Sequence, residues 1–132
     1  MSNIISLDIG MKRTGICICL EGILLPQRGE ETDKLDKRLC QILSENSYSL
    51  AVVGLPLDKD MRETDMAAKI KEKVKNLKSL EGLRIEFFDE RLSTKEAERM
   101  SRETFKKDKR RDAVDSLSAM LILEEYLRNE KK

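Results

Sequence analysis

Ile4-Ile5-Ser6-Leu7-Asp8-Ile9-Gly10 is the stretch from which the rest of the chain can be interpreted. Its apolar run is typical of a buried β-strand, and Asp8 near the end of the run places a carboxylate where the strand leaves the sheet. Gly10 opens a turn that extends to Arg13, and a second apolar strand is expected over Gly15–Leu20. The chain is therefore predicted to begin with two strands joined by a glycine-flanked turn, with Asp8 beside that turn.

Three more strands are expected further along the chain. Ile23–Leu25 follows a hairpin turn, and Pro26 either confines this third strand to a sheet edge or ends it early. Leu50–Gly54 is wholly apolar, as expected for a strand that is covered on both faces. Apolar and polar residues alternate over Leu83–Phe87, which is typical of a fifth strand. Together these stretches predict an α/β fold with a five-stranded mixed sheet.

Helices are expected between and after the strands, because apolar residues recur there at helical spacing. The first has Thr32 or Asp33 as its N-cap, the second ends near Gly82, and the last begins at about Asp112. The apolar positions behind these predictions are Leu35, Leu39, Ile42 and Leu43, then Met66, Ala67, Ile70, Val74 and Leu77, and finally Val114, Leu117, Leu121 and Leu127. We therefore expect one domain over residues 1–132, with helices on both faces of its sheet.

The chain contains no histidine, and this absence excludes several kinds of site. Acid–base chemistry through imidazole, zinc sites built on histidine and Ser-His-Asp triads are all impossible. Carboxylate chemistry with hard, oxygen-binding metal ions such as Mg²⁺ or Mn²⁺ remains possible. Charged residues make up 39% of the chain but the formal net charge is only +1, so nucleic acid would have to be attracted by local basic patches.

The three cysteines are interpreted as small buried hydrophobic residues. Cys17 and Cys19 alternate with isoleucines and therefore share one face of a strand, whereas Cys40 lies in an apolar helical stripe. The chain has no CxxC pair, which disfavours a thiolate metal site. We find no signal peptide and no membrane-spanning segment, so we expect a cytoplasmic protein without membrane contact.

Acidic residues occupy the ends of three predicted elements. Asp8 ends the first strand, Asp89 and Glu90 follow the fifth, and Asp112 and Asp115 lie three residues apart at the start of the last helix. A helix presents residues at this spacing on one face. Clustered carboxylates can hold metal ions that activate water and stabilise charge on a phosphoryl group. The acids therefore predict a metal-dependent nuclease.

Some of these acids also have a simpler interpretation. Asp8 could cap the turn that follows it, and Asp112 could be the N-cap of the last helix. Asp115 lies among apolar residues, where an unpaired acid would be costly, and this favours a ligand. Asp89 and Glu90 face opposite sides of a regular strand, so only one of them can join the cluster. We favour Glu90 as the metal ligand and Asp89 as the residue that holds the loop or Arg91.

Two sets of basic residues are expected to bind nucleic acid. Lys12 and Arg13 lie in the first turn and Arg91 follows the fifth strand, so all three could contact phosphates. Five more crowd the segment before the last helix, namely Lys106, Lys107, Lys109, Arg110 and Arg111. Either set could instead be merely solvated, but the position of the second set beside Asp112 favours a nucleic-acid contact.

Four blocks of the sequence resemble the signature blocks of the YqgF (RuvX) family. They are Leu7-Asp8-Ile9-Gly10-Met11-Lys12-Arg13-Thr14-Gly15, Val53-Gly54-Leu55-Pro56-Leu57, Asp89-Glu90-Arg91-Leu92-Ser93-Thr94 and Val114-Asp115-Ser116. Their order and spacing match the family nearly end to end. One departure follows Leu57, where the family usually has a glycine and this chain has Asp58-Lys59-Asp60-Met61-Arg62-Glu63.

This resemblance implies a ribonuclease-H-like fold and a nuclease that matures the 5′ end of pre-16S ribosomal RNA. A Holliday junction (four-way DNA) resolvase and a non-catalytic nucleic-acid-binding module are the alternatives. In the family's fold Asp8 would be the bridging ligand, and Glu90, Asp112 and Asp115 would complete a site for Mg²⁺ or Mn²⁺. The substrate would be a ribosomal RNA precursor or branched DNA, and we expect a monomer or a weak homodimer.

The Asp8-x-Gly10 pattern also opens sugar kinases and actin-like ATPases, which share the same core fold. Those proteins need further phosphate loops and generally a second domain, for which 132 residues leave no room. We therefore expect nucleic-acid chemistry rather than ATP hydrolysis.

Overall fold

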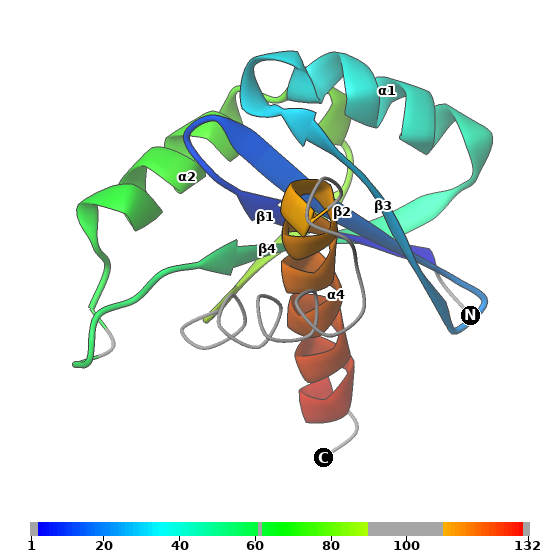
Figure 1. The fold of residues 1–132 in the computed structure, drawn as a ribbon. Coiled ribbons are helices and arrows are strands. Elements are labelled where there is room, and N and C mark those ends of the chain that lie inside the picture. Colours follow the sequence, from blue (N-terminus) through cyan, green and yellow to red (C-terminus); the bar gives the residue numbers. More distant parts are fainter. Residues whose placement is uncertain (1–2, 61, 90–109, 131–132) are drawn as a thin grey trace.

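A computed structural model describes residues 3–60, 62–89 and 110–130 and, for residues 110–115 and 130, the backbone alone. Five strands form one sheet in the order β3-β2-β1-β4-β5 (Figure 1). Their bounds are β1 Asn3–Ile9, β2 Arg13–Leu20, β3 Ile23–Glu31, β4 Tyr48–Leu55 and β5 Arg84–Asp89. The first three strands are antiparallel neighbours, whereas β4 and β5 run parallel to β1. The predicted five-stranded mixed sheet is therefore confirmed.

Helices cover both faces of this sheet, as predicted (Figure 1). Helices α1 (Leu35–Glu45) and α2 (Asp65–Lys75) pack on one face, and α4 (Arg110–Glu130) packs on the other. Successive side chains of a strand point to opposite faces of the sheet. In β1, Leu7 therefore faces α1 and α2, whereas Ser6 faces α4. Within the described ranges, no helix has the length and apolar character needed to cross a membrane.

The third strand is longer than predicted. It runs from Ile23 to Glu31 and passes through Pro26, which pairs with Cys17 at the edge of the sheet. An edge strand needs hydrogen-bond donors toward one neighbour only, so proline does not end it there. The expectation of an edge strand was right, and the alternative of an early end was wrong.

The predicted N-cap of the first helix was wrong. Neither Thr32 nor Asp33 caps α1, because a short 3₁₀ helix, η1 (Thr32–Lys34), comes first and α1 begins after Lys34 without a side-chain cap. Thr32 is buried, and its Oγ1 donates to the carbonyl of Gly10 at 2.8 Å. This bond ties the end of β3 to the turn after β1. A threonine that favours capping was therefore used for a tertiary contact.

The second helix also ends earlier than predicted. Its last residue is Lys75, and a 3₁₀ turn, η2 (Lys78–Leu80), leads to Gly82. The backbone of Gly82 has a φ of 91°, a value that glycine adopts without strain. The apolar stripe continued through η2, since Leu77 and Leu80 are buried in the same cluster as α2. Periodicity alone could not separate the two elements.

Two of the three cysteines are buried, but the prediction for Cys40 was wrong. Cys17 and Cys19 lie in the cluster under α4, whereas Cys40 is exposed. The buried stripe of α1 consists of Leu35, Leu39 and Ile42. Cys40 follows Leu39 by one residue, which is a rotation of about 100° around the helix and carries its side chain out of the stripe.

This difference predicts selective thiol chemistry. Burial raises the pKa of the Cys17 thiol to about 12, so this thiol stays protonated and unreactive at pH 8. A disulfide-exchange reagent at pH 8 should therefore modify one thiol per native chain rapidly and the other two only after unfolding in urea. Cys40→Ser should remove the fast phase. Rapid reaction of two or three thiols in the native protein would contradict the burial of Cys17 and Cys19.

Candidate functional site

The carboxyl ends of β1, β4 and β5 meet at one edge of the sheet, because these three strands are parallel. Asp8 is the last residue but one of β1, and Asp89 is the last residue of β5. Ligands of open α/β sheets characteristically bind outside this edge. The edge therefore holds two of the acids that the sequence singled out.

Asp8 lies between two glycines. In β2 its partner is Gly15, and in β4 the register pairs Leu7 with Val53, so that Gly54 is level with Asp8. Both glycines are buried, while Asp8 is half-buried. The residues level with Asp8 in the two neighbouring strands therefore carry no side chain.

Helix α4 crosses the face of the sheet that carries the Ser6 side chain and is held there by polar contacts. The Ser6 hydroxyl donates to the carbonyl of Ala119 at 2.7 Å, and both residues are fully buried. Ser116 donates to the carbonyl of Gln27 in β3. At the other end, the Tyr126 hydroxyl donates to Glu86 of β5. Ser6 and Asp8 are two residues apart in β1 and therefore point to the same face of the sheet, the face to which α4 docks.

Asp112 and Asp115 lie in the first two turns of α4, whose backbone begins at Arg110. Asp112 is therefore the third residue of the helix rather than its N-cap, and that alternative was wrong. Asp115 precedes Ala119 by four residues, and residues at this spacing share one helix face. Ala119 contacts Ser6 of β1, and Ser116, the residue after Asp115, contacts Gln27 of β3.

Asp89 belongs to the opposite face from Asp8. Phe88 packs edge-on against Tyr126 of α4, with ring centres 6.2 Å apart, so the next residue alternates away from α4. The partner of Asp89 in β4 is Leu55, which lies in the cluster under α1 and α2. Glu90 and Arg91 lie outside the described residues. Tyr126 of α4 thus forms an aromatic pair with the residue before Asp89.

Lys12 and Arg13 belong to a turn whose backbone is closed by a hydrogen bond. The amide of Gly10 donates to the carbonyl of Arg13 at 2.9 Å. A Cβ on Gly10 would lie 2.7 Å from that oxygen, so only glycine fits. Lys12 is exposed at the turn, and Arg13 is half-buried at the start of β2. The turn therefore presents cationic residues within five positions of Asp8.

The other basic residues are only partly described. Arg110 and Arg111 open α4, and Lys106, Lys107 and Lys109 lie outside the described residues. Among side chains that the structure describes, no three acids or cysteines are close enough together to hold a metal ion. The predicted cluster includes Glu90, Asp112 and Asp115, whose side chains are not among them. It therefore stays a prediction.

Comparison with known proteins assigns the chain to a family. Residues 2–129 match the family described as "RuvX: Holliday junction resolvase". The chain belongs to the RuvX family. A relative from Sulfurihydrogenibium sp. named "Putative pre-16S rRNA nuclease" is 36% identical, over 96% of this chain and 90% of its own length. A relative with the same name from Fusobacterium nucleatum is also 36% identical, over 96% and 97% of the two chains.

Solved structures of RuvC have the same fold as this RuvX-family chain. Thermus thermophilus RuvC is 14% identical, with 97% of this chain and 96% of that chain covered and a TM-score of 0.58. The T. thermophilus RuvC in complex with Holliday junction substrate is 11% identical, covers 89% and 92%, and has a TM-score of 0.52. The expected ribonuclease-H-like fold is thus confirmed, and at this identity the likeness concerns the fold alone.

The loop after Leu57, which departs from the family's pattern, is closed by the side chain of Asp58. Asp58 accepts hydrogen bonds through Oδ1 from the amides of Asp60 and Arg62, at 2.8 and 2.9 Å. Aspartate commonly stabilises turns in this way. Thr64 then caps α2 by accepting from the amide of Ala67 at 3.1 Å. The loop therefore has its own local support without the usual glycine.

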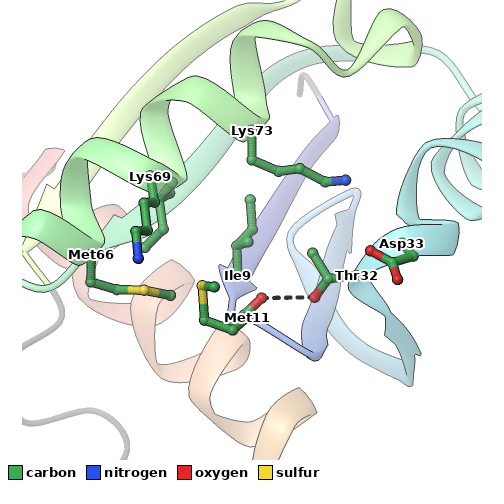
Figure 2. Close-up of a pocket in the computed structure, with 9 residues that line it drawn as sticks. Ile9, Met11, Thr32, Asp33, Met66, Lys69 and Lys73 are labelled. Atoms are coloured by element: carbon green, nitrogen blue, oxygen red, sulfur yellow. Dashed lines mark hydrogen bonds between the residues drawn. The ribbon is translucent and has the colours of Figure 1, made fainter.

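One cavity was missed by the sequence analysis. It lies between α2 and the turn after β1, on the face opposite to α4, and is lined by Lys69 and Lys73 (Figure 2). The signal was present, because these lysines are four residues apart beside the apolar positions Met66 and Ile70. It was not recognised because lysines on an amphipathic helix are ordinarily solvated.

The Ser6–Ala119 hydrogen bond predicts a measurable contribution to stability. Ser6→Ala removes a buried donor that joins β1 to α4, and should lower the free energy of unfolding by about 0.5–1.5 kcal/mol in urea titrations. Ser44→Ala is the matched control, because Ser44 makes a bond of equal length to Gln41 on the exposed surface of α1. The control should change stability by less than about 0.5 kcal/mol. Equal effects of the two substitutions would contradict the proposed docking of α4 through Ser6.

Proposed function

We propose that this RuvX-family protein is a metal-dependent endonuclease that matures the 5′ end of pre-16S ribosomal RNA. The observation that carries the proposal is the position of Asp8 between Gly15 and Gly54, on the sheet face to which α4 docks. Relatives that are 36% identical over nearly their whole length bear the name of a pre-16S rRNA nuclease. The chain is accordingly a hydrolase acting on phosphodiester bonds.

The alternatives have less support. A Holliday junction substrate is suggested by the family description and by the RuvC complex, but the latter likeness is at 11% identity. The curated relatives favour ribosomal RNA instead. The names of these relatives also give no support to a non-catalytic binding module. Membership of the RuvX family likewise disfavours the ATPase interpretation.

The residues of the edge fit a hard divalent cation. Asp8, Glu90 and Asp115 are the proposed catalytic acids, and Asp112 is a further ligand. Carboxylate oxygens are the ligands that Mg²⁺ and Mn²⁺ prefer, and the chain offers no histidine to compete with them. When bound, such ions supply an activated water and positive charge for the transferring phosphoryl group. The sheet holds Asp8 rigidly, and the Ser6 contact fixes α4 relative to it.

The choice between Asp89 and Glu90 follows from alternation along β5. Asp89 lies on the face of α1 and α2, whereas Asp8 faces α4. A residue that continues the pattern after Asp89 returns to the face of Asp8. We therefore keep Glu90 as the ligand and Asp89 as a residue that positions the loop.

The basic residues would hold the nucleic acid by its phosphates. Lys12 and Arg13 in the first turn, together with Arg91, are proposed to contact the backbone close to the cleaved bond. Such contacts position a substrate without reading its sequence. Cytoplasmic location and a monomeric or weakly dimeric state remain predictions from the sequence.

Replacing Asp8 tests the proposed activity. Asp8→Asn keeps the shape of the side chain but removes its charge, so cleavage of a pre-16S rRNA fragment in Mg²⁺ should be abolished. The free energy of unfolding should change by less than about 1 kcal/mol. Glu45→Gln is the control, because Glu45 is an exposed acid at the end of α1, before β4 begins. Cleavage by Asp8→Asn at the wild-type rate would show that the acid is not part of the site.

The segment before α4 is tested by salt dependence. The triple substitution of Lys106, Lys107 and Lys109 by alanine should weaken RNA binding, because each phosphate contact releases counterions. The slope of log affinity against log salt should become shallower by about two units. The loss should be similar for unrelated sequences of the same shape. Unchanged affinity and slope would mean that these lysines are only solvated.

A further inference from the structure

A cavity of about 250 Å³ lies at the same edge of the sheet as Asp8, but on the opposite face (Figure 2). Its walls are the end of β1 with the following turn, the η1 turn and one side of α2. Gly10 lines it, and Gly10 follows Asp8 by only two residues, which span at most about 7 Å of chain. Only the end of β1 therefore separates the cavity from the proposed cleavage site.

The apolar part of the cavity suits the flat face of a base. Ile9 and Ile70 are buried residues of its lining, and the side chains of Met66 from α2 and Met11 from the turn lie next to each other in Figure 2. Met11 is 64% exposed, which is unusual for a large apolar side chain. Thioether sulfur is polarisable and makes favourable contacts with aromatic rings. The two methionines therefore form an adaptable surface against which a ring could pack.

The polar part of the cavity suits a phosphate and a ribose. Lys69 and Lys73 lie one helical turn apart, and neither forms an ion pair within the part of the chain that the structure describes. Lys71 differs, because it pairs with Glu63 at 2.9 Å. Across the cavity lies Asp33, an exposed carboxylate that can only accept hydrogen bonds when ionised (Figure 2). Lysines can bind phosphate, and a carboxylate can accept from ribose hydroxyls.

We propose that this cavity binds one ribonucleotide of the substrate strand, next to the nucleotide whose phosphate lies at Asp8. The base packs on Met11 and Met66, the phosphate contacts Lys69 and Lys73, and the 2′-hydroxyl donates to Asp33. The 2′-hydroxyl distinguishes RNA from DNA, so the cavity contributes to the choice of substrate. The proposal rests on the proposed function, because a strand held at Asp8 has to pass over the Gly10 turn to enter the cavity.

The test uses the full-length protein in EDTA, so that binding is measured without cleavage. Methionine methyl groups are labelled with ¹³C, and adenosine 5′-monophosphate is added while their NMR signals are followed. The signals of Met11 and Met66 should shift in a saturable way. The double variant Lys69→Gln/Lys73→Gln should bind at least about tenfold more weakly, since charge-assisted contacts to phosphate are lost. Lys75→Gln, an exposed lysine of α2 outside the cavity, should bind within about twofold of wild type.

The role of Asp33 is tested with 2′-deoxyadenosine 5′-monophosphate. The wild-type protein should prefer the ribonucleotide by about fivefold or more, and Asp33→Asn should reduce that preference, because an amide accepts a hydrogen bond less strongly than a carboxylate. Unshifted Met11 and Met66 signals, or equal binding by the double variant, would overturn the proposal. Saturable binding of an acidic peptide but of no nucleotide would overturn it in favour of a protein partner.

Failure of this proposal can be told apart from failure of the proposed function. If wild-type protein binds the nucleotide at these methionines but does not cleave pre-16S rRNA, the nucleotide-binding cavity is supported and the nuclease assignment is contradicted. If cleavage is intact and depends on Asp8 while the methionine signals do not move, the nuclease assignment stands and the cavity proposal falls.

Discussion

The hydrogen bond from Ser6 to the carbonyl of Ala119 joins segments 113 residues apart, and the candidate site depends on it. It is buried in the layer between the sheet and α4, where an unpaired hydroxyl would be costly. The two-residue period of β1 places Asp8 on the same face as Ser6, which is the face on which α4 packs. Together with the Ser116–Gln27 and Tyr126–Glu86 contacts, this bond holds α4 on the sheet face of Asp8.

Much of the architecture was predictable from the sequence, because its strands and helices have recognisable local patterns of apolar residues. The apolar run of β1, the uninterrupted run of β4 and the alternation in β5 each gave a strand of the right kind. Element ends were less predictable. Thr32 favours capping by its chemistry, but its hydroxyl instead reaches the carbonyl of Gly10 in another element. Cys40 was misassigned because a stripe of leucines marks a helix face only to within one residue.

The candidate site was predictable in its chemistry but not in its shape. Asp8 stood out from its place at a strand end, and the absence of histidine pointed to carboxylates. The two glycines beside Asp8 were not singled out, because Gly15 and Gly54 are far apart in the chain and only strand pairing makes them neighbours of Asp8. The cavity beside α2 was missed partly for the same reason, in addition to the ordinary solvation of lysines on an amphipathic helix. Its residues come from β1, η1 and α2, and no short motif contains them.

The central claim is that a divalent ion binds where α4 meets the end of β1. Paramagnetic broadening of backbone amide signals by Mn²⁺ tests this most directly, because Mn²⁺ shares the oxygen ligands of Mg²⁺ and broadens only signals near to it. We predict that substoichiometric Mn²⁺ broadens the amides of Asp8, Gly15, Gly54 and Asp115 before others, and that excess Mg²⁺ reverses the effect. Broadening centred away from this edge, or uniform broadening at the exposed acids, would contradict the account.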